Sequence, residues 1–212
     1  MFPFGRGEAC GTGASAVTIP NPEVDNPLSA VKGQETAVVA GGCFWGIQAV
    51  FEHVKGVIRA TSGYSGGAAN TATYEKVCGG RTGHAEAVQV VFDPSQISFG
   101  QILKVFFSVA HDPTELNRQG PDTGTQYRSA IFYSSEDQKR ISSAYVEQLN
   151  APKVFPRPIV TQIVPLDAFY PAEDYHQGYA EQHPENMYIV VNDLPKVDNL
   201  QKQLPELFVE RK

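Results

Sequence analysis

The chain has 212 residues, 42% of them hydrophobic and 19% charged, and carries a formal net charge of −6 at pH 7. This composition is typical of a globular protein with one large domain and a substantial core. The acidic balance and the lack of any basic run argue against binding to nucleic acid or to an anionic membrane. No apolar segment approaches the length of a membrane span, and the N-terminus lacks the apolar stretch of a signal peptide. We therefore expect a cytoplasmic monomer.

The three cysteines, Cys10, Cys43 and Cys78, are too few and too far apart for a disulfide framework. The sequence contains no C-x-x-C pair of the kind that forms a structural zinc site. We therefore expect neither a metal nor another bound cofactor. A cysteine that does chemistry in this chain would act as a nucleophile or as a redox group.

The first 34 residues are rich in Gly, Ala, Ser, Pro and Asn and show no periodicity, which predicts a mobile or surface-hugging N-terminal extension. Period-two and short apolar runs predict strands at 36–41, 57–64, 84–92, 128–133 and 160–165. Helical spacing predicts helices at 44–54 and 136–149, a short turn at 74–78, and a helix that Ser98 caps.

The order strand–helix–strand–strand–helix–strand predicts an α+β fold. The specific expectation is a ferredoxin-like two-layer α/β sandwich with long loops and N- and C-terminal extensions, its helices on one face of a mostly antiparallel sheet. We predict three parts: the extension 1–34, a catalytic domain 35–180, and a C-terminal tail 181–212 that packs on the domain. Helical fragments at 175–182 and 197–204 carry only a weak core pattern.

The stretch Gly41-Gly42-Cys43-Phe44-Trp45-Gly46 joins the first predicted strand to the first predicted helix. A cysteine at such a turn lies near the positive end of a helix, where a thiolate is favoured. Phe44 and Trp45 place two large apolar surfaces beside this potential nucleophile. A buried structural cysteine in a glycine turn is the alternative reading.

A catalytic cysteine needs an acid or base nearby, and His84 and Glu86 are one candidate pair. In a strand both point to the face that also carries Val88 and Val90. A carboxyl on an apolar face is desolvated, so its pKa rises and Glu86 becomes a candidate general acid. The alternative is a strand-end carboxylate paired with an arginine, Arg81 or Arg128.

Three other functions remain open on this pattern. His84 and Glu86 fit the H-x-E half of a zinc deaminase signature, but no P-C-x-x-C follows. A cysteine hydrolase could use Cys43 as nucleophile, His84 as base and Asp122 as orienting group. That triad leaves the bulk of Phe44 and Trp45 unexplained. A non-catalytic binding module is the third option.

Further polar side chains lie on glycine-rich loops. Asp122 and Tyr127 belong to the segment from Gly120 to Ser129, and Tyr64 and Tyr74 lie on earlier loops. Phenols at such positions are more often rim or core residues than ligands.

Three segments together closely resemble the A-type peptide methionine sulfoxide reductases: residues 42–46, residues 71–74 with 82–87, and residues 124–129. The resemblance covers about residues 35–180, and the segments stand in the family's order. It implies that this chain reduces methionine S-sulfoxide, free or in proteins, to methionine.

The resemblance also implies roles for seven residues. Cys43 would attack the sulfoxide sulfur as a thiolate and become a sulfenic acid, while Glu86 would protonate the sulfoxide oxygen. Tyr74, Tyr127 and Asp122 would hold that oxygen. Phe44 and Trp45 would form the apolar wall that receives the methyl group on sulfur.

The chain departs from many family members because no cysteine follows Cys78. Resolving cysteines in the C-terminal tail are therefore absent from this sequence. Cys10 on the N-terminal extension, or an external thiol such as thioredoxin, glutaredoxin or glutathione, could reduce the sulfenic acid; dithiothreitol would serve in vitro. Cys78 is a weaker option, since its short apolar turn predicts a packed thiol.

Overall fold

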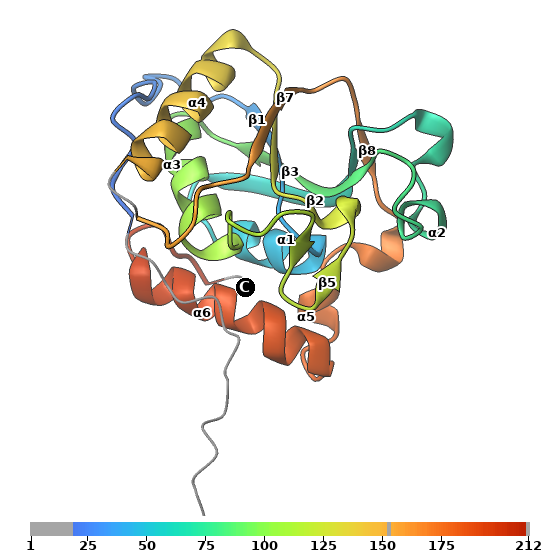
Figure 1. Cartoon of the computed structure of the whole chain (residues 1–212). Helices are drawn as coiled ribbons and strands as arrows, with labels where there is room; N and C mark the ends of the chain where they lie inside the picture. Colours follow the sequence, from blue (N-terminus) through green and yellow to red (C-terminus); the bar gives the residue numbers. More distant parts are fainter. Residues whose placement is uncertain (1–18, 152–153, 211–212) are drawn as a thin grey trace, which may run out of the picture.

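The structure is a computed structural model that describes residues 19–151 and 154–210. Within these ranges six strands form one mixed sheet in the order β7-β6-β1-β3-β2-β8 (Figure 1). The strands are β1 (Glu35–Ala40), β2 (Val57–Ser65), β3 (Ala85–Phe92), β6 (Ala130–Tyr133), β7 (Gln162–Pro165) and β8 (Phe169–Pro171), with β4 (Arg118–Gln119) and β5 (Asp122–Thr123) pairing separately. The α-helices are α1 (Phe44–Glu52), α2 (Tyr74–Val77), α3 (Phe99–Val105), α4 (Glu136–Asn150), α5 (Tyr179–Gln182) and α6 (Leu194–Gln203). The 3₁₀ helices are η1 (Ala69–Thr71), η3 (Thr125–Tyr127) and η4 (Asp174–His176), and the π-helices are η2 (Phe106–Ala110) and η5 (Ile189–Asp193).

The central strand β1 pairs antiparallel with β3 on one side and with β6 on the other. β2 lies beyond β3 and is antiparallel to it, whereas β7 runs parallel to β6 at the far edge. The run from Ala37 to Ala40 is buried throughout, because this strand is covered on both faces. Such strands are continuously apolar and do not alternate with polar residues.

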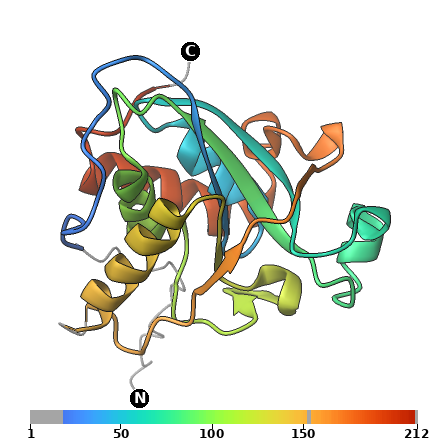
Figure 2. The ribbon, with the colours of Figure 1, turned by 90° about the horizontal axis from the view of Figure 1, so that it is seen from above.

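The two faces of the sheet are covered differently. One face carries Val39, Val88 and Val90 into the main apolar core, which α1, α3 and α4 supply with large side chains. In Figure 2, α3 and α4 lie side by side against the sheet. The other face presents small residues such as Ala85 and Ala87, and the chain around Val164 to Phe169 packs on it. Helices therefore lie mainly on one face, the face that also carries Glu86.

Local signals predicted several of these elements well. Ser98 caps α3 in a complete capping box with Gln101, as its position suggested. β8 was not predicted, and the predicted strand at 160–165 is β7, which adds to the edge of the sheet.

The weak core pattern of the C-terminal segment was misleading. Leu200, Leu204 and Leu207 are buried in the main core, and α6 packs along α1 (Figure 1). These leucines contact residues that are distant in sequence, so the local apolar periodicity could not predict their burial. No helix among the described residues is long and apolar enough to cross a membrane.

The described part of the N-terminal extension, residues 19–34, forms neither helix nor strand. It is tied to the helical layer: Tyr145 Oη donates to the Pro20 carbonyl at 2.7 Å, and the Gly100 amide donates to Asp25 at 3.0 Å. Ile19 is buried in the main core. Cys10 lies outside the described residues.

Candidate active site

The turn between β1 and α1 fixes Cys43 as the N-cap residue of α1. Gly42 has a φ of +98°, and a Cβ there would lie 2.5 Å from the Gln119 side chain. Only glycine accommodates both the left-handed backbone and the close neighbour. The turn thus delivers Cys43, which is 8% exposed, to the end of the sheet where β1 finishes.

Glu86, the second residue of β3, lies beside this turn. Its carboxylate Oε2 accepts a hydrogen bond from the Phe44 amide at 3.1 Å. Burial, opposed by the Phe44 amide and assisted by the negative charges of Asp122 and Asp193, raises the pKa of Glu86 to about 8. The expectation of a desolvated carboxyl on an apolar face is confirmed, so Glu86 holds a proton at neutral pH.

The Cys43 thiol differs from the sequence expectation. Burial raises its pKa well above the ordinary value, and the carboxylates of Glu86 and Asp193 act in the same direction. The Trp45 amide at the start of α1 and the Lys196 ammonium lower that pKa, but they are outweighed. The helix N-terminus therefore favours the thiolate, as predicted, but in the free protein desolvation outweighs this effect and the net shift is upward.

Aromatic rings surround the start of α1. The Trp45 indole stacks on Tyr179 with centroids 3.8 Å apart and planes 10° apart, and Tyr188 meets its edge at 6.0 Å. The buried Phe44 ring lies 5.1 Å from the His176 imidazole. Phe44 and Trp45, which follow Cys43 directly, thus pack among aromatic rings of the C-terminal part of the fold.

Tyr74 at the start of α2 and Tyr127 at the end of η3 both interact electrostatically with Glu86 and Cys43. Burial raises the pKa of Tyr74, and so do the charges of Glu86 and Cys43. Burial likewise raises the pKa of Tyr127, and the negative charges of Glu86 and Asp122 raise it to a smaller extent. Both phenols therefore remain protonated as donors, within electrostatic reach of Glu86 and Cys43.

Asp122 on β5 is held by a residue that the sequence did not point to. The Tyr188 hydroxyl, from the C-terminal segment, donates a hydrogen bond to Asp122 Oδ2. Burial raises the pKa of Tyr188, and the Cys43 charge is the next cause. Asp122 is thus at the site and is tied to the C-terminal segment through Tyr188.

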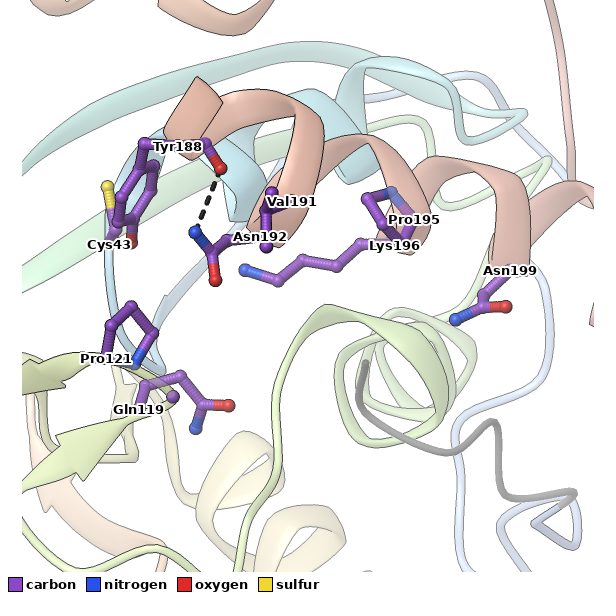
Figure 3. A pocket seen from close by; sticks show the side chains of 10 residues that line it. Cys43, Gln119, Pro121, Tyr188, Val191, Asn192, Pro195, Lys196 and Asn199 are labelled. Carbon is purple, nitrogen blue, oxygen red and sulfur yellow. Dashed lines mark hydrogen bonds between the residues drawn. The ribbon is translucent and has the colours of Figure 1, made fainter. Parts of the chain in front are cut away.

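A hollow opens at Cys43 between the β4–β5 hairpin and the C-terminal helical segment (Figure 3). In Figure 3 the Tyr188 ring lies beside the Cys43 sulfur, and Lys196 extends along the hollow toward Asn192. The Lys196 ammonium pairs with Asp193 at 3.1 Å. Sequence reasoning missed Tyr188, Asp193 and Lys196, because no chemical motif marks this segment.

Cys78 and His84 also differ from their expected environments. Cys78 is exposed, not packed, and hydrogen bonds with the Tyr74 side chain. His84 is buried just before β3; its Nε2 lies 3.0 Å from the Ala68 carbonyl oxygen. Its Nδ1 has no hydrogen-bond partner among the described residues. Among the described residues His84 hydrogen bonds to neither Cys43 nor Asp122, so they form no Cys43–His84–Asp122 triad there.

The remaining alternatives find no support in the geometry either. Arg128 donates to the carbonyls of Thr125 and Gly83, and no ion pair joins it to Glu86 in the residues described. Across residues 19–151 and 154–210, no group of three His, Cys, Asp or Glu side chains is arranged to hold a metal ion.

Comparison with known proteins identifies the family. A family model described as peptide methionine sulfoxide reductase matches residues 35–207. The chain belongs to this family. A relative named peptide methionine sulfoxide reductase MsrA 2, from Mesorhizobium japonicum, is 57% identical over 182 residues, or 86% of this chain and 93% of the relative. A Deinococcus radiodurans relative, named peptide methionine sulfoxide reductase MsrA, is 51% identical over 80% of this chain and 82% of its own length.

Solved structures of the family have the same mixed α/β architecture. Mxr1 from Saccharomyces cerevisiae in reduced form matches with a TM-score of 0.67 at 31% identity, over 80% of this chain and 96% of its own. Methionine sulfoxide reductase A of Corynebacterium diphtheriae matches with a TM-score of 0.62 at 37% identity, over 81% and 87%. The family suggested by the three sequence segments is therefore confirmed.

Proposed function

We propose that this member of the family reduces methionine S-sulfoxide, free or in proteins, through attack of Cys43 on sulfur with Glu86 as proton donor. The observation that carries this proposal is the protonated, buried carboxyl of Glu86, hydrogen bonded to the amide next to Cys43. A general acid with a pKa near the working pH is well suited to this transfer.

The proposed step conserves atoms and protons. The Cys43 sulfur forms a bond to the sulfoxide sulfur while Glu86 protonates the sulfoxide oxygen. The S–S bond and the substrate S–O bond then break as the oxygen bonds to Cys43, which becomes a sulfenic acid, oxidised by two electrons, while methionine leaves with its sulfur reduced by two electrons. The proton lost by the Cys43 thiol replaces the one given by Glu86. The raised pKa of the thiol implies that ionisation accompanies substrate binding.

The substrate pocket follows from the polar and apolar sides of the site. Phe44 and Trp45 receive the methyl group, and their aromatic packing supports this role. Tyr74, Tyr127 and Asp122 hold the oxygen. A small polar oxygen and an apolar methyl on one sulfur require this pairing of surfaces.

Recycling of the sulfenic acid requires a second thiol. We propose Cys10 or an external thiol of the thioredoxin, glutaredoxin or glutathione kind. Treatment with free methionine sulfoxide without reductant, followed by mass measurement, separates the routes. An internal disulfide appears as a loss of two hydrogens, and a persistent sulfenic acid as a gain of one oxygen. A disulfide that persists in Cys10→Ser would exclude Cys10.

We further propose the ferredoxin-like sandwich as the core of the fold, with 1–34 as an extension, 35–180 as the catalytic domain and 181–212 as a tail on that domain. The adjacent order β6-β1-β3-β2 and the helices on one face support the fold. A cytoplasmic monomer remains our proposal for its cellular state.

Cys43→Ser tests the main proposal, with dithiothreitol as reductant and methionine S-sulfoxide as substrate. We expect loss of all turnover, because a hydroxyl cannot replace the sulfur nucleophile. Circular dichroism should show an unchanged fold. Turnover retained by the folded variant would overturn the assignment, and so would hydrolysis of peptides or esters by the unaltered protein in place of sulfoxide reduction.

A further inference from the structure

The only tryptophan of the chain is held by a histidine from the C-terminal part of the fold. Trp45 Nε1 donates a hydrogen bond to Nδ1 of His176 at 3.1 Å. An indole nitrogen can only donate, so Nδ1 must be unprotonated and the imidazole neutral, with its proton on Nε2. The bond spans 131 residues of sequence and joins α1 to η4.

His176 lies deep in the aromatic cluster of the site. Its side chain is 2% exposed, and its ring centroid lies 4.4 Å from that of Tyr74 and 5.1 Å from that of Phe44. Nε2 is buried and has no hydrogen-bond partner among the described residues. A buried polar group with an unmet donor is costly, so a histidine placed there calls for an explanation that apolar packing does not give.

Stacking alone does not fix the indole. The face of Trp45 lies on Tyr179, and a parallel stack does not by itself fix the rotation of the indole within its own plane. A hydrogen bond from the indole edge removes that freedom, because it requires one direction and one distance. The His176 bond therefore selects one placement of the indole beside Cys43.

We propose that His176 is a positioning residue, which fixes the Trp45 indole so that its surface forms the methyl-binding wall for the sulfoxide. This inference rests on the proposed function, in which Trp45 receives the methyl group. His176 acts through Trp45 and does not take part in the chemical step. Loss of the bond should weaken substrate binding more than turnover, since the wall contacts substrate before and during the reaction.

The test compares two substitutions at one position. Asn in His176→Asn keeps an acceptor oxygen near the place of Nδ1, whereas His176→Phe keeps a planar ring without an acceptor. We expect a KM for methionine S-sulfoxide about tenfold higher in His176→Phe, with a smaller change in kcat. In His176→Asn the KM should return to within about threefold of the unaltered protein. His53→Phe is the control, since His53 bonds to Ala49 and stacks on Phe208.

Fluorescence gives a readout that does not depend on activity. Because Trp45 is the sole tryptophan, its emission maximum reports on the indole alone. We expect the maximum to shift in His176→Phe and to stay unchanged in His176→Asn and His53→Phe. Equal KM values and equal emission maxima in all four proteins would overturn the inference. An equal rise in KM in His176→Asn and His176→Phe would also overturn it.

A double substitution guards against a general loss of structure. In a Trp45→Phe background the indole donor is absent, so adding His176→Phe should leave KM unchanged. A further rise in KM would overturn the inference, since His176 would then act by another route. Absence of sulfoxide reduction by the unaltered protein is a separate result, which would count against the proposed function.

Discussion

Glu86 shows how one side chain takes its chemistry from its place on a strand. The same face of β3 carries Val88 and Val90 into the core, so the carboxyl is removed from water along with them. Among the described residues the Phe44 amide is its one backbone donor and lowers its pKa, but burial dominates. A carboxyl with a pKa of about 8 is therefore a proton donor at neutral pH.

Glu86→Gln should retain the hydrogen bond from Phe44 and lose the proton. We expect the rate of sulfoxide reduction to fall about 10²- to 10⁴-fold, the usual contribution of a general acid. Steady-state kinetics with dithiothreitol measure this loss. Glu75→Gln is the matched control, because Glu75 is exposed on nearby α2 and should change the rate little. A Glu86→Gln rate within threefold of the unaltered protein would exclude Glu86 as the acid.

At the scale of elements, the contact between α1 and α6 depends on glycine at position 46, which has no side chain. A Cβ on Gly46, in the first turn of α1, would lie 2.1 Å from Asp193 Oδ1 and 2.8 Å from Lys196 Nζ. Asp193 is fully buried, and its pair with Lys196 spans 3.1 Å. A carboxylate near a helix N-terminus is favourable. Glycine therefore allows a charged pair of the C-terminal segment to close over the helix that begins at Cys43.

Gly46→Ala tests this contact. Alanine favours a helix over glycine by about 1 kcal/mol, which alone would stabilise the protein. Here the methyl group must displace a buried ion pair, so we expect a net loss of about 1–3 kcal/mol in the free energy of unfolding. Urea denaturation measures it. In the control Gly33→Ala, the new Cβ meets only Pro94, at 3.6 Å, and stability should hold. A Gly46→Ala protein as stable as the parent would contradict the argument.

The same contact explains what the sequence could and could not predict. The segments around Cys43, Phe44 and Glu86 have a local sequence pattern that predicts both the secondary structure and the chemical role of these residues. Tyr188 and Asp193 reach the site because η5 and α6 pack on α1, and His176 is bonded to Trp45 of α1. These are contacts between segments more than 100 residues apart. Short helical turns, not a regular apolar stripe, carry these residues. Neither periodicity nor a motif marks them.

At the scale of the whole molecule, two buried titratable groups set opposite limits on stability. His111 bonds to Phe106 O and to Ser129, and burial lowers its pKa from 6.5 to about 4. The contribution of neutral His111 to the free energy of unfolding is present above pH 6.5 and is lost as the pH falls toward 4. Glu86 has a raised pKa, so its contribution is present below pH 4.5 and is lost as the pH rises toward 8.

Between pH 4.5 and 6.5 these two effects oppose each other, and above pH 6.5 the Glu86 effect stands alone. Each pH unit below the raised pKa is worth about 1.4 kcal/mol, so ionisation of Glu86 should cost about 2 kcal/mol between pH 6.5 and 8. Glu86→Gln cannot ionise, and its free energy of unfolding should exceed that of the parent by a margin that grows over this range. Urea denaturation of both proteins at pH 5, 6.5 and 8 measures the margin. A constant difference would mean that Glu86 ionises equally in the folded and unfolded chains, and the acid proposed for catalysis would then lack the protonated state on which it depends.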